Sequence, residues 1–303
     1  EFNKKLKGKE FDFIFAPRAS SEIALLKTDI PIIYLSDATF DSLYGYYEWF
    51  SNFMQISIRE GNKIEQLALN KAAICIFTSE WAANSAISKY RIDPLKIHRL
   101  PFGPNMDNIP TQQLSLNNKQ RDVCKLLFLG VEWERKGGAV AFDTMIELKK
   151  RGIKSSLTVC GCIPPDTYHD DDLTVIPFLN KNNPEDYKVF ESLLLEHHFL
   201  IVPTRAECFG VVFAEASAFG IPSLTSDTGG TAASVMNHKN GFRFSLQAKG
   251  SDYADKIQEI FSNYEQQYLP LVASTRETFL QEYDWESIAR KFSGIILKHF
   301  PKE

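Results

Sequence analysis

Two glutamates stand eight residues apart in a strand–turn–helix pattern between Pro203 and Pro222. The apolar run at residues 198–203 is typical of a buried parallel strand, and residues 210–219 are typical of the helix that follows it. Glu207 then lies at the carboxyl end of the strand, where open α/β sheets bind ligands and free N–H groups favour a diphosphate. Glu215 lies about 7.5 Å beyond the helix start. This offset would let one carboxylate face a sugar while the other accepts hydrogen bonds from a ribose of the same ligand.

A second strand-to-helix turn carries basic residues. Gly130 follows the apolar run at residues 125–129, and Arg135 and Lys136 come just before the next predicted helix. Because the carboxyl ends of parallel strands meet at one edge of a sheet, these cations should project into the same crevice as Glu207. There they could neutralise a leaving diphosphate, which is work that a divalent metal does in other enzymes. The alternative is a solvated basic pair, which the dipole of the helix disfavours at its N-terminus.

These turns resemble the Glu-x7-Glu signature of retaining family 4 glycosyltransferases, which have the GT-B fold. The residues in step with that signature are Pro203, Thr204, Glu207, Phe209, Gly210, Glu215, Ala216, Gly220, Pro222, Gly229 and Gly230. The basic turn is similar too, since a Lys-Gly pair follows its first Gly by six residues. The resemblance implies an α/β protein of two facing Rossmann-like domains, each a doubly wound parallel sheet. It also implies transfer of a sugar from a nucleotide-diphosphate sugar to a hydroxyl acceptor.

The resemblance gives each turn of the C-terminal half a role toward the donor. Gly130, Arg135 and Lys136 would bind the diphosphate, and Phe209, Gly210 and Val211 would contact the sugar or β-phosphate through their backbone. Glu215 would bind the ribose and Leu179 would contact the base. Gly229 and Gly230 form a further turn of the site. Glu207 would be catalytic, through the hydroxyls of the donor sugar. The chain departs from the family at two places, with Val131 where many members have Arg and Ala233 near the place of a usual Glu.

Asp37 is the second candidate catalytic residue, in the N-terminal half. It follows the predicted strand at residues 31–35, near the point where many relatives carry a His, and this chain has no His before His98. We therefore expect Asp37 to take a polar, sugar-facing role. The alternative is that Asp37 caps the helix that follows, as Asp readily does.

Apolar runs of strand length alternate with helical patterns along the chain, which is typical of parallel doubly wound sheets. The predicted strands cover residues 12–16, 31–35, 73–77, 96–100, 125–129, 156–160, 173–176, 199–202 and 222–225. The predicted helices cover residues 20–27, 41–52, 59–71, 79–89, 138–151, 184–197, 210–219, 230–236, 251–264 and 287–299, with Ser79 as an N-cap. Residues 101–105 break this pattern and residues 111–122 carry none, so we expect a linker there.

Three parts are expected from these elements. Residues 1–110 form a partial acceptor-side domain, residues 111–280 form the nucleotide-sugar donor-binding domain, and residues 281–303 form a helix that crosses back to the first domain. The first part has about four predicted strands and lacks the glycine-rich loop that opens this domain in the family, so we expect it to be truncated. The chain also begins without Met, which favours an upstream segment.

Composition narrows the class of protein. The net charge of −4 and the pI near 5.9 argue against a nucleic-acid binder, which needs a concentrated basic surface. Five cysteines without metal-ligand spacing favour a reducing, cytoplasmic setting. The sequence has no run of about 18 apolar residues, so we expect no membrane-spanning helix in it. Peripheral contact with a membrane remains an alternative. The acidic run Asp170–Asp172 contains an Asp-x-Asp pattern, but its place in a loop favours a solvated surface over a metal site, so we expect neither metal nor cofactor.

The sequence therefore predicts a hexosyl-type glycosyltransferase of class EC 2.4 in glycan or glycoconjugate biosynthesis. Its partners would be a nucleotide sugar and a glycan, a lipid-linked or a small-molecule acceptor. Two alternatives remain open. One is a module that binds a nucleotide sugar without turnover, and the other is a GT-B sugar-nucleotide epimerase. The pattern does not select the base, the sugar or the acceptor, because such specificity depends on loop shape.

Overall fold

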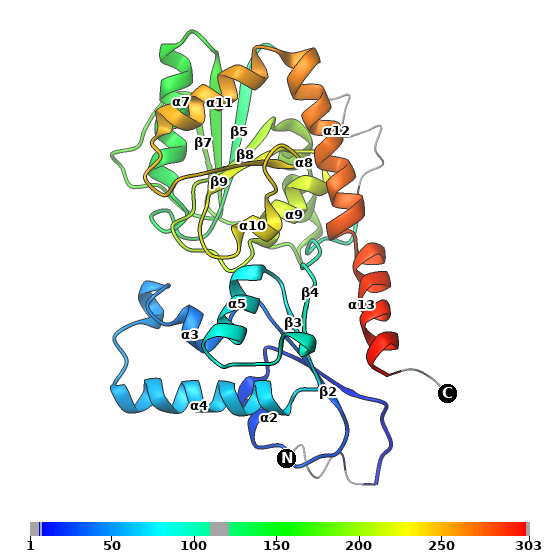
Figure 1. The fold of residues 1–303 in the computed structure, drawn as a ribbon. Coiled ribbons are helices and arrows are strands. Elements are labelled where there is room, and N and C mark those ends of the chain that lie inside the picture. Colours follow the sequence, from blue (N-terminus) through cyan, green and yellow to red (C-terminus); the bar gives the residue numbers. More distant parts are fainter. Residues whose placement is uncertain (1–5, 7, 110–120, 301–303) are drawn as a thin grey trace. The chain divides into compact units, whose positions relative to one another are not determined.

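The structure is a computed structural model that describes residue 6, residues 8–109 and residues 121–300. The chain divides into two compact units, each with its own parallel sheet (Figure 1). The N-terminal unit comprises residues 1–101 and 290–303, and the C-terminal unit comprises residues 102–289. One division thus falls within residues 101–105, the first part of the expected linker, and the other falls within the last helix. Most of the expected linker at residues 111–122 lies outside the described residues.

The N-terminal unit is built on a four-stranded sheet in the order β1-β2-β3-β4, with every neighbouring pair parallel. Its elements are β1 (Ile14–Pro17), α2 (Ser20–Ala24), β2 (Ile32–Ser36), α3 (Phe40–Leu43), the 3-10 helix η1 (Glu48–Phe50), α4 (Gln55–Lys71), β3 (Ile74–Phe77), α5 (Glu80–Ser88), the 3-10 helix η2 (Pro94–Lys96) and β4 (Ile97–Arg99). Ser79 caps α5 as predicted, because its side chain accepts the N–H of Ala82. β3 is buried along its whole length, as expected for a parallel strand covered on both faces.

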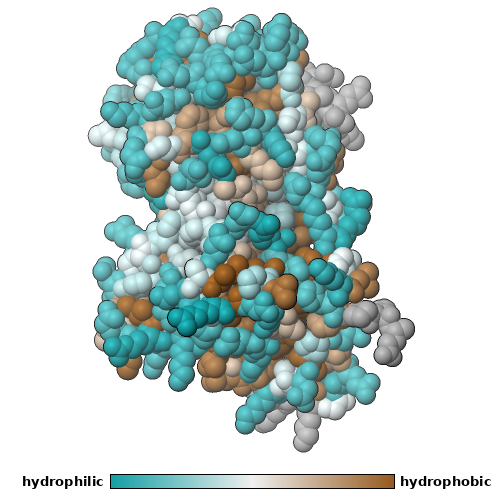
Figure 2. Space-filling view, viewed as in Figure 1, coloured by the Kyte–Doolittle hydropathy of each residue, from teal (hydrophilic) through white to brown (hydrophobic). Residues whose placement is uncertain are grey.

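The predicted helix at residues 41–52 is wrong beyond Leu43. Gly45 and Asn52 adopt φ angles of 77° and 58°, which a continuing right-handed helix cannot accommodate. Aromatic rings hold this segment instead, through a series of contacts that includes the pair Phe50–Phe53, with ring centroids 4.9 Å apart. Trp49 in this segment is 65% exposed. Figure 2 shows hydrophobic side chains among the hydrophilic ones on the surface of this unit.

The C-terminal unit is built on a six-stranded parallel sheet in the order β10-β9-β8-β5-β6-β7. Its strands are β5 (Cys124–Leu129), β6 (Ser155–Cys160), β7 (Leu173–Ile176), β8 (Phe199–Val202), β9 (Ser223–Ser226) and β10 (Gly241–Phe244). Its helices are α7 (Gly138–Lys150), α8 (Pro184–Glu196), α9 (Val211–Ala218), α10 (Thr231–Ser234), α11 (Gly250–Phe261), α12 (Leu269–Thr278) and the short π-helices η3 (Tyr264–Tyr268) and η4 (Phe279–Tyr283). Helix α13 (Trp285–His299) begins in this unit and ends in the other.

Alternate side chains of the central strand β5 enter two different cores. Leu126 and Phe128 pack with residues of α7 and α11, whereas Leu127 and Leu129 pack with residues of α8 and α9. Because successive side chains of a strand point to opposite faces, helices must cover both faces of this sheet. The doubly wound α/β fold class predicted from the sequence is therefore confirmed for this unit.

Apart from η3 and η4, two elements of the C-terminal unit were not predicted. Strand β10 lies at one edge of the sheet, beside β9, and helix α12 packs beside α9. Several predicted ends also move by a few residues, so that α4 begins at Gln55 rather than Arg59 and α11 ends at Phe261 rather than Tyr264. These differences leave the strand-to-helix turns of the candidate site in place. Within the described residues, every helix falls short of the length and apolar character that a membrane span requires.

Candidate functional site

The first turn of the site joins β5 to α7, and its course depends on Gly137. This residue is the N-cap of α7 and adopts a φ angle of 77°, in the left-handed region that favours glycine. A Cβ atom at this position would lie 2.1 Å from the carbonyl oxygen of Pro203. Glycine therefore lets the basic turn pack directly on the backbone that follows β8.

Hydrogen bonds join this basic turn to the turn after β8. The N–H of Arg205 donates to the Arg135 carbonyl oxygen at 2.7 Å, and the Arg135 guanidinium donates back to the Ala206 carbonyl oxygen at 2.9 Å. Next to them, the Lys136 ammonium forms an ion pair with the Glu207 carboxylate. Their side chains are only 10% and 12% exposed, so this pair lies in a largely desolvated setting.

The turn after β8 is also hydrogen-bonded to the third predicted turn, which precedes α10. The N–H of Gly230 donates to the Glu207 carbonyl oxygen at 2.9 Å, and the Ser234 hydroxyl donates to the Phe209 carbonyl oxygen at 2.5 Å. Gly210 is the N-cap of α9 with a φ angle of 83°. The two turns thus fix the backbone that leads into α9, and the Gly230 amide is used inside the protein rather than toward a ligand.

Glu215 lies on α9 and is 3% exposed. Its Oε1 atom accepts hydrogen bonds from the Lys181 ammonium at 2.6 Å and from the Asn105 N–H at 3.3 Å. Burial raises the pKa of this carboxyl, while Lys181 and Asn105 act in the opposite direction. The sequence predicted Glu215 but neither of its partners, because both lie in polar, non-periodic stretches far from it in the chain.

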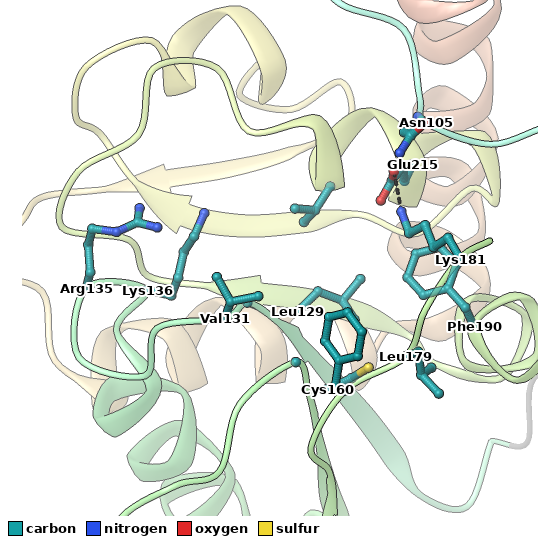
Figure 3. Close-up of a pocket in the computed structure, with 14 residues that line it drawn as sticks. Asn105, Leu129, Val131, Arg135, Lys136, Cys160, Leu179, Lys181, Phe190 and Glu215 are labelled. Atoms are coloured by element: carbon teal, nitrogen blue, oxygen red, sulfur yellow. Dashed lines mark hydrogen bonds and ion pairs between the residues drawn. The ribbon is translucent and has the colours of Figure 1, made fainter. Parts of the chain in front are cut away.

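A cavity of about 440 Å³ connects these residues (Figure 3). Its lining is Asn105, Leu129, Gly130, Val131, Arg135, Lys136, Cys160, Gly161, Phe178, Leu179, Lys181, Phe190, Val212 and Glu215. Five of the predicted site residues are among them, namely Gly130, Arg135, Lys136, Leu179 and Glu215. The volume lies within the usual range of small-molecule sites.

The cavity has two different ends. Figure 3 shows Arg135 and Lys136 at one end, and Glu215 with Lys181 and Phe190 at the other. The apolar side chains of Leu129 and Val131 lie between the two ends. A basic end suits phosphate groups, and a carboxylate end suits hydroxyl groups that donate hydrogen bonds. The arrangement therefore fits an elongated ligand with an anionic and a hydroxyl-bearing part.

Other predicted residues lie beside the cavity without lining it. Glu207 joins it through the ion pair with Lys136, so the structure brings residues 136, 207 and 215 into one site. The predicted backbone contacts and the further turn lie in the turns that support it, and they are Phe209, Gly210, Val211, Gly229 and Gly230. The sequence did not predict Phe178 or Phe190, although both supply aromatic lining.

Asp37 belongs to the N-terminal unit, directly after β2. Its carboxylate lies 3.8 Å from the Arg18 guanidinium, and its side chain is 22% exposed. The alternative role as a helix cap is wrong, because Thr39 is the N-cap of α3 and forms a capping box with Ser42. The sugar-facing role of Asp37 stays a prediction.

The acidic run in the loop before β7 is paired with a lysine. Lys149 lies 2.6 Å from the carboxylates of both Asp170 and Asp172, so this Asp-x-Asp pattern is an ion-pair cluster. Across residues 8–109 and 121–300, no group of three or more His, Cys, Asp and Glu side chains has an arrangement that could hold a metal ion. All five cysteines are free thiols.

Two parallel-sheet Rossmann-like units and a cavity at the carboxyl ends of β5 and β6 define a protein of the GT-B class. A family model described as "Family 4 Glycosyltransferase in conflict systems" matches residues 58–292, and the chain belongs to this family. The predicted family 4 membership and GT-B fold are thus confirmed. A search of curated proteins by sequence finds no match.

Several solved structures are similar to this chain. Sucrose-phosphate synthase from Thermosynechococcus elongatus is 18% identical with a TM-score of 0.70, and the match covers 99% of this chain and 76% of that one. The apo form of the lipopolysaccharide outer core galactosyltransferase WaaB is 15% identical with a TM-score of 0.68, over 98% and 78% of the two chains. Anabaena HepE in complex with UDP is 16% identical with a TM-score of 0.64, over 89% and 72%. At these identities the likeness concerns the fold.

Proposed function

We propose that this chain is a retaining glycosyltransferase that moves a hexosyl group from a nucleotide-diphosphate sugar to a hydroxyl acceptor, in the synthesis of a glycan or glycoconjugate. The observation that carries the proposal is the cavity with Arg135 and Lys136 at one end and Glu215 at the other. A nucleotide sugar has an anionic diphosphate next to a ribose diol, so its two parts match the two ends. The UDP complex of HepE, a protein of similar fold, supports the same class of ligand.

Each residue then has a task toward the donor. The cations of Arg135 and Lys136 take up the charge that develops on the leaving diphosphate, and in our proposal they replace a divalent metal. Glu215 accepts hydrogen bonds from the ribose, and Leu179 contacts the base. Glu207, beside Lys136, orients the hydroxyls of the donor sugar.

The transfer step itself needs little chemistry from the protein. The bond between C1 of the sugar and the β-phosphate oxygen breaks, and a bond from C1 to the acceptor oxygen forms on the same face. The proton of the acceptor hydroxyl passes to the leaving phosphate. Rate enhancement then comes from positioning and from stabilisation of the leaving group. The free N–H groups at the start of α9, beginning at Val211, favour the anionic β-phosphate, and Asp37 takes a polar role toward the acceptor.

A transfer assay tests this proposal. The full chain is incubated with UDP-, GDP-, ADP- and TDP-hexoses and a mixture of glycoside acceptors, and both released nucleoside diphosphate and product are measured. We expect release that depends on the acceptor, survives EDTA, and gives a product with the donor's anomeric configuration by NMR. Binding without release would instead favour the binding module. Formation of an epimeric sugar without an acceptor would favour the epimerase, and loss of transfer in EDTA would overturn metal independence.

A further inference from the structure

The hydrogen bonds to Glu215 fall on only one of its two carboxylate oxygens. Lys181 and the backbone N–H of Asn105 both donate to Oε1. Within the described part of the chain, no group donates a hydrogen bond to Oε2. This atom is also not one of the fully buried polar atoms without a partner, so part of its surface is accessible. Since Glu215 lines the cavity, Oε2 remains available to a ligand there (Figure 3).

Lys181 is itself held in a defined place. It lies in the loop between β7 and α8, and its ammonium lies 4.1 Å from the centroid of the Phe190 ring. Phe190 is buried on α8, and the Lys181 side chain is 28% exposed. A cation between an aromatic face and a carboxylate is attracted by both, so its position is fixed from two sides.

The surroundings of Glu215 make this lysine necessary. Burial favours the neutral acid and raises the pKa of Glu215, and Lys181 is the charged group that most opposes this effect. Arg135 and Lys136 line the same cavity but at its opposite end. From α12, which packs on α9, Arg276 donates to the Ala218 backbone carbonyl. A carboxylate accepts hydrogen bonds from both hydroxyls of a ribose, whereas a protonated carboxyl has lost much of that capacity.

We propose that Lys181 is a positioning residue for nucleotide recognition, which holds Glu215 as a carboxylate and keeps its Oε2 atom free for the ribose hydroxyls. This inference rests on the proposed donor site. It assigns the selection of a ribonucleotide to one loop residue, Lys181, and one helix residue, Glu215, and it explains why a lysine lies at the end of the cavity remote from the diphosphate.

The test measures how much the ribose hydroxyls contribute to binding. Calorimetry on the full chain first identifies the tightest ligand among UDP, GDP and ADP, and then compares this ligand with its 2′,3′-dideoxy analogue at pH 7 and pH 9. We expect the wild-type chain to bind the analogue at least tenfold more weakly at both pH values. In Lys181→Met the ratio should be lower than in the wild type at pH 7 and should rise toward pH 9, because higher pH favours the carboxylate form of Glu215.

Three further variants complete the test. Lys188→Met removes the same charge from an exposed position on α8 and should behave as wild type. Lys181→Arg should restore the ratio at pH 7, and Glu215→Gln should give a ratio near one at both pH values. A role in folding alone would not produce a ratio that depends on pH.

Two results would overturn the inference while leaving the donor site intact. One is a Lys181→Met chain that keeps the wild-type ratio at pH 7, and the other is a ratio that is lost equally at pH 7 and pH 9. If the wild-type chain binds none of the three nucleotides, the proposed donor site fails, and this inference fails with it. Lys181→Gln serves as a second variant should Lys181→Met be unstable.

Discussion

Lys136 is the residue on which donor binding should depend most directly. Its ammonium is largely buried beside Glu207 and lies at the basic end of the cavity. We expect Lys136→Met to weaken binding of the preferred nucleoside diphosphate at least tenfold, since a charge-assisted contact in a desolvated site is lost. Calorimetry at constant ionic strength measures this change.

The control for that prediction is Lys150→Met. Lys150 lies in the last turn of the same helix α7 and its side chain is 65% exposed, so the same charge is removed far from the cavity. Its affinity should stay within twofold of wild type. Equal affinities in Lys136→Met and wild type would remove Lys136 from the site.

Glu65 gives the N-terminal unit a pH dependence. This carboxyl is 4% exposed, accepts a hydrogen bond from the Tyr34 hydroxyl at 3.3 Å, and burial raises its pKa to about 7. The folded state therefore binds more protons than the unfolded state between about pH 4.5 and pH 7. The free energy of unfolding should fall as the pH rises through this window and stay reduced above it.

Glu65→Gln should remove this dependence, because the amide keeps the shape of the side chain without a charge. Relative to wild type, the variant should gain roughly 2–3 kcal/mol of stability between pH 5 and pH 8. Urea unfolding at both pH values measures the difference. Glu60→Gln, an exposed change on the same helix α4, is the control and should show no such trend. A flat difference for Glu65→Gln would contradict the buried ionisation.

Sequence reasoning found the site residues that sit in recognisable turns and missed those that do not. Lys136 and Glu215 follow strand ends at spacings that match the family pattern, so both could be predicted. Lys181 lies in the polar loop at residues 180–183, and its partner is 34 residues away. No local periodicity signals such a contact, because it depends on the way this loop meets helix α9 in the fold.

At the scale of elements, the close packing of two turns explains why glycine occupies position 137. Gly137→Ala would combine a strained φ angle with a clash against the Pro203 carbonyl. We expect a loss of roughly 2–4 kcal/mol in unfolding free energy, or a displaced basic turn with weaker nucleotide binding. Chemical denaturation and calorimetry separate the two results.

Gly152→Ala is the matched control. Gly152 adopts nearly the same φ angle, 78°, but a Cβ there meets nothing within 4 Å. Only the backbone strain remains, so the cost should be about 1 kcal/mol and nucleotide binding should be unchanged. Similar effects of both substitutions would show that the contact between the two turns contributes little.

Strands with buried, β-branched residues were predicted almost residue by residue, and β8 at Phe199–Val202 matches its prediction.

Helix α12 was missed, although Pro270 in its first turn is a known start signal. Strand β10 has only four residues and lies at the sheet edge, where burial is incomplete and the apolar signal is weak. Helix α3 was overextended because the prediction ran the helix through Gly45 and Asn52, which adopt positive φ angles.

At the scale of the whole molecule, nucleotide binding should protect one unit selectively. The cavity is lined by residues of the C-terminal unit alone. We expect a saturating nucleoside diphosphate to slow hydrogen exchange in β5, β8 and α9, while β1 to β4 exchange at their former rates. Exchange measured by mass spectrometry with and without the ligand checks this. Protection confined to the N-terminal unit would place the nucleotide elsewhere.

The N-terminal unit is assembled from two distant stretches of the chain. Phe292 and Phe300 contact Phe15 and Phe13, so the last helix and the residue after it supply aromatic partners to the first strand region. During synthesis the ribosome must therefore release about 190 intervening residues before these rings can meet. The C-terminal unit can finish folding before the segment that completes the N-terminal unit has been made, so early termination of translation would harm the N-terminal unit.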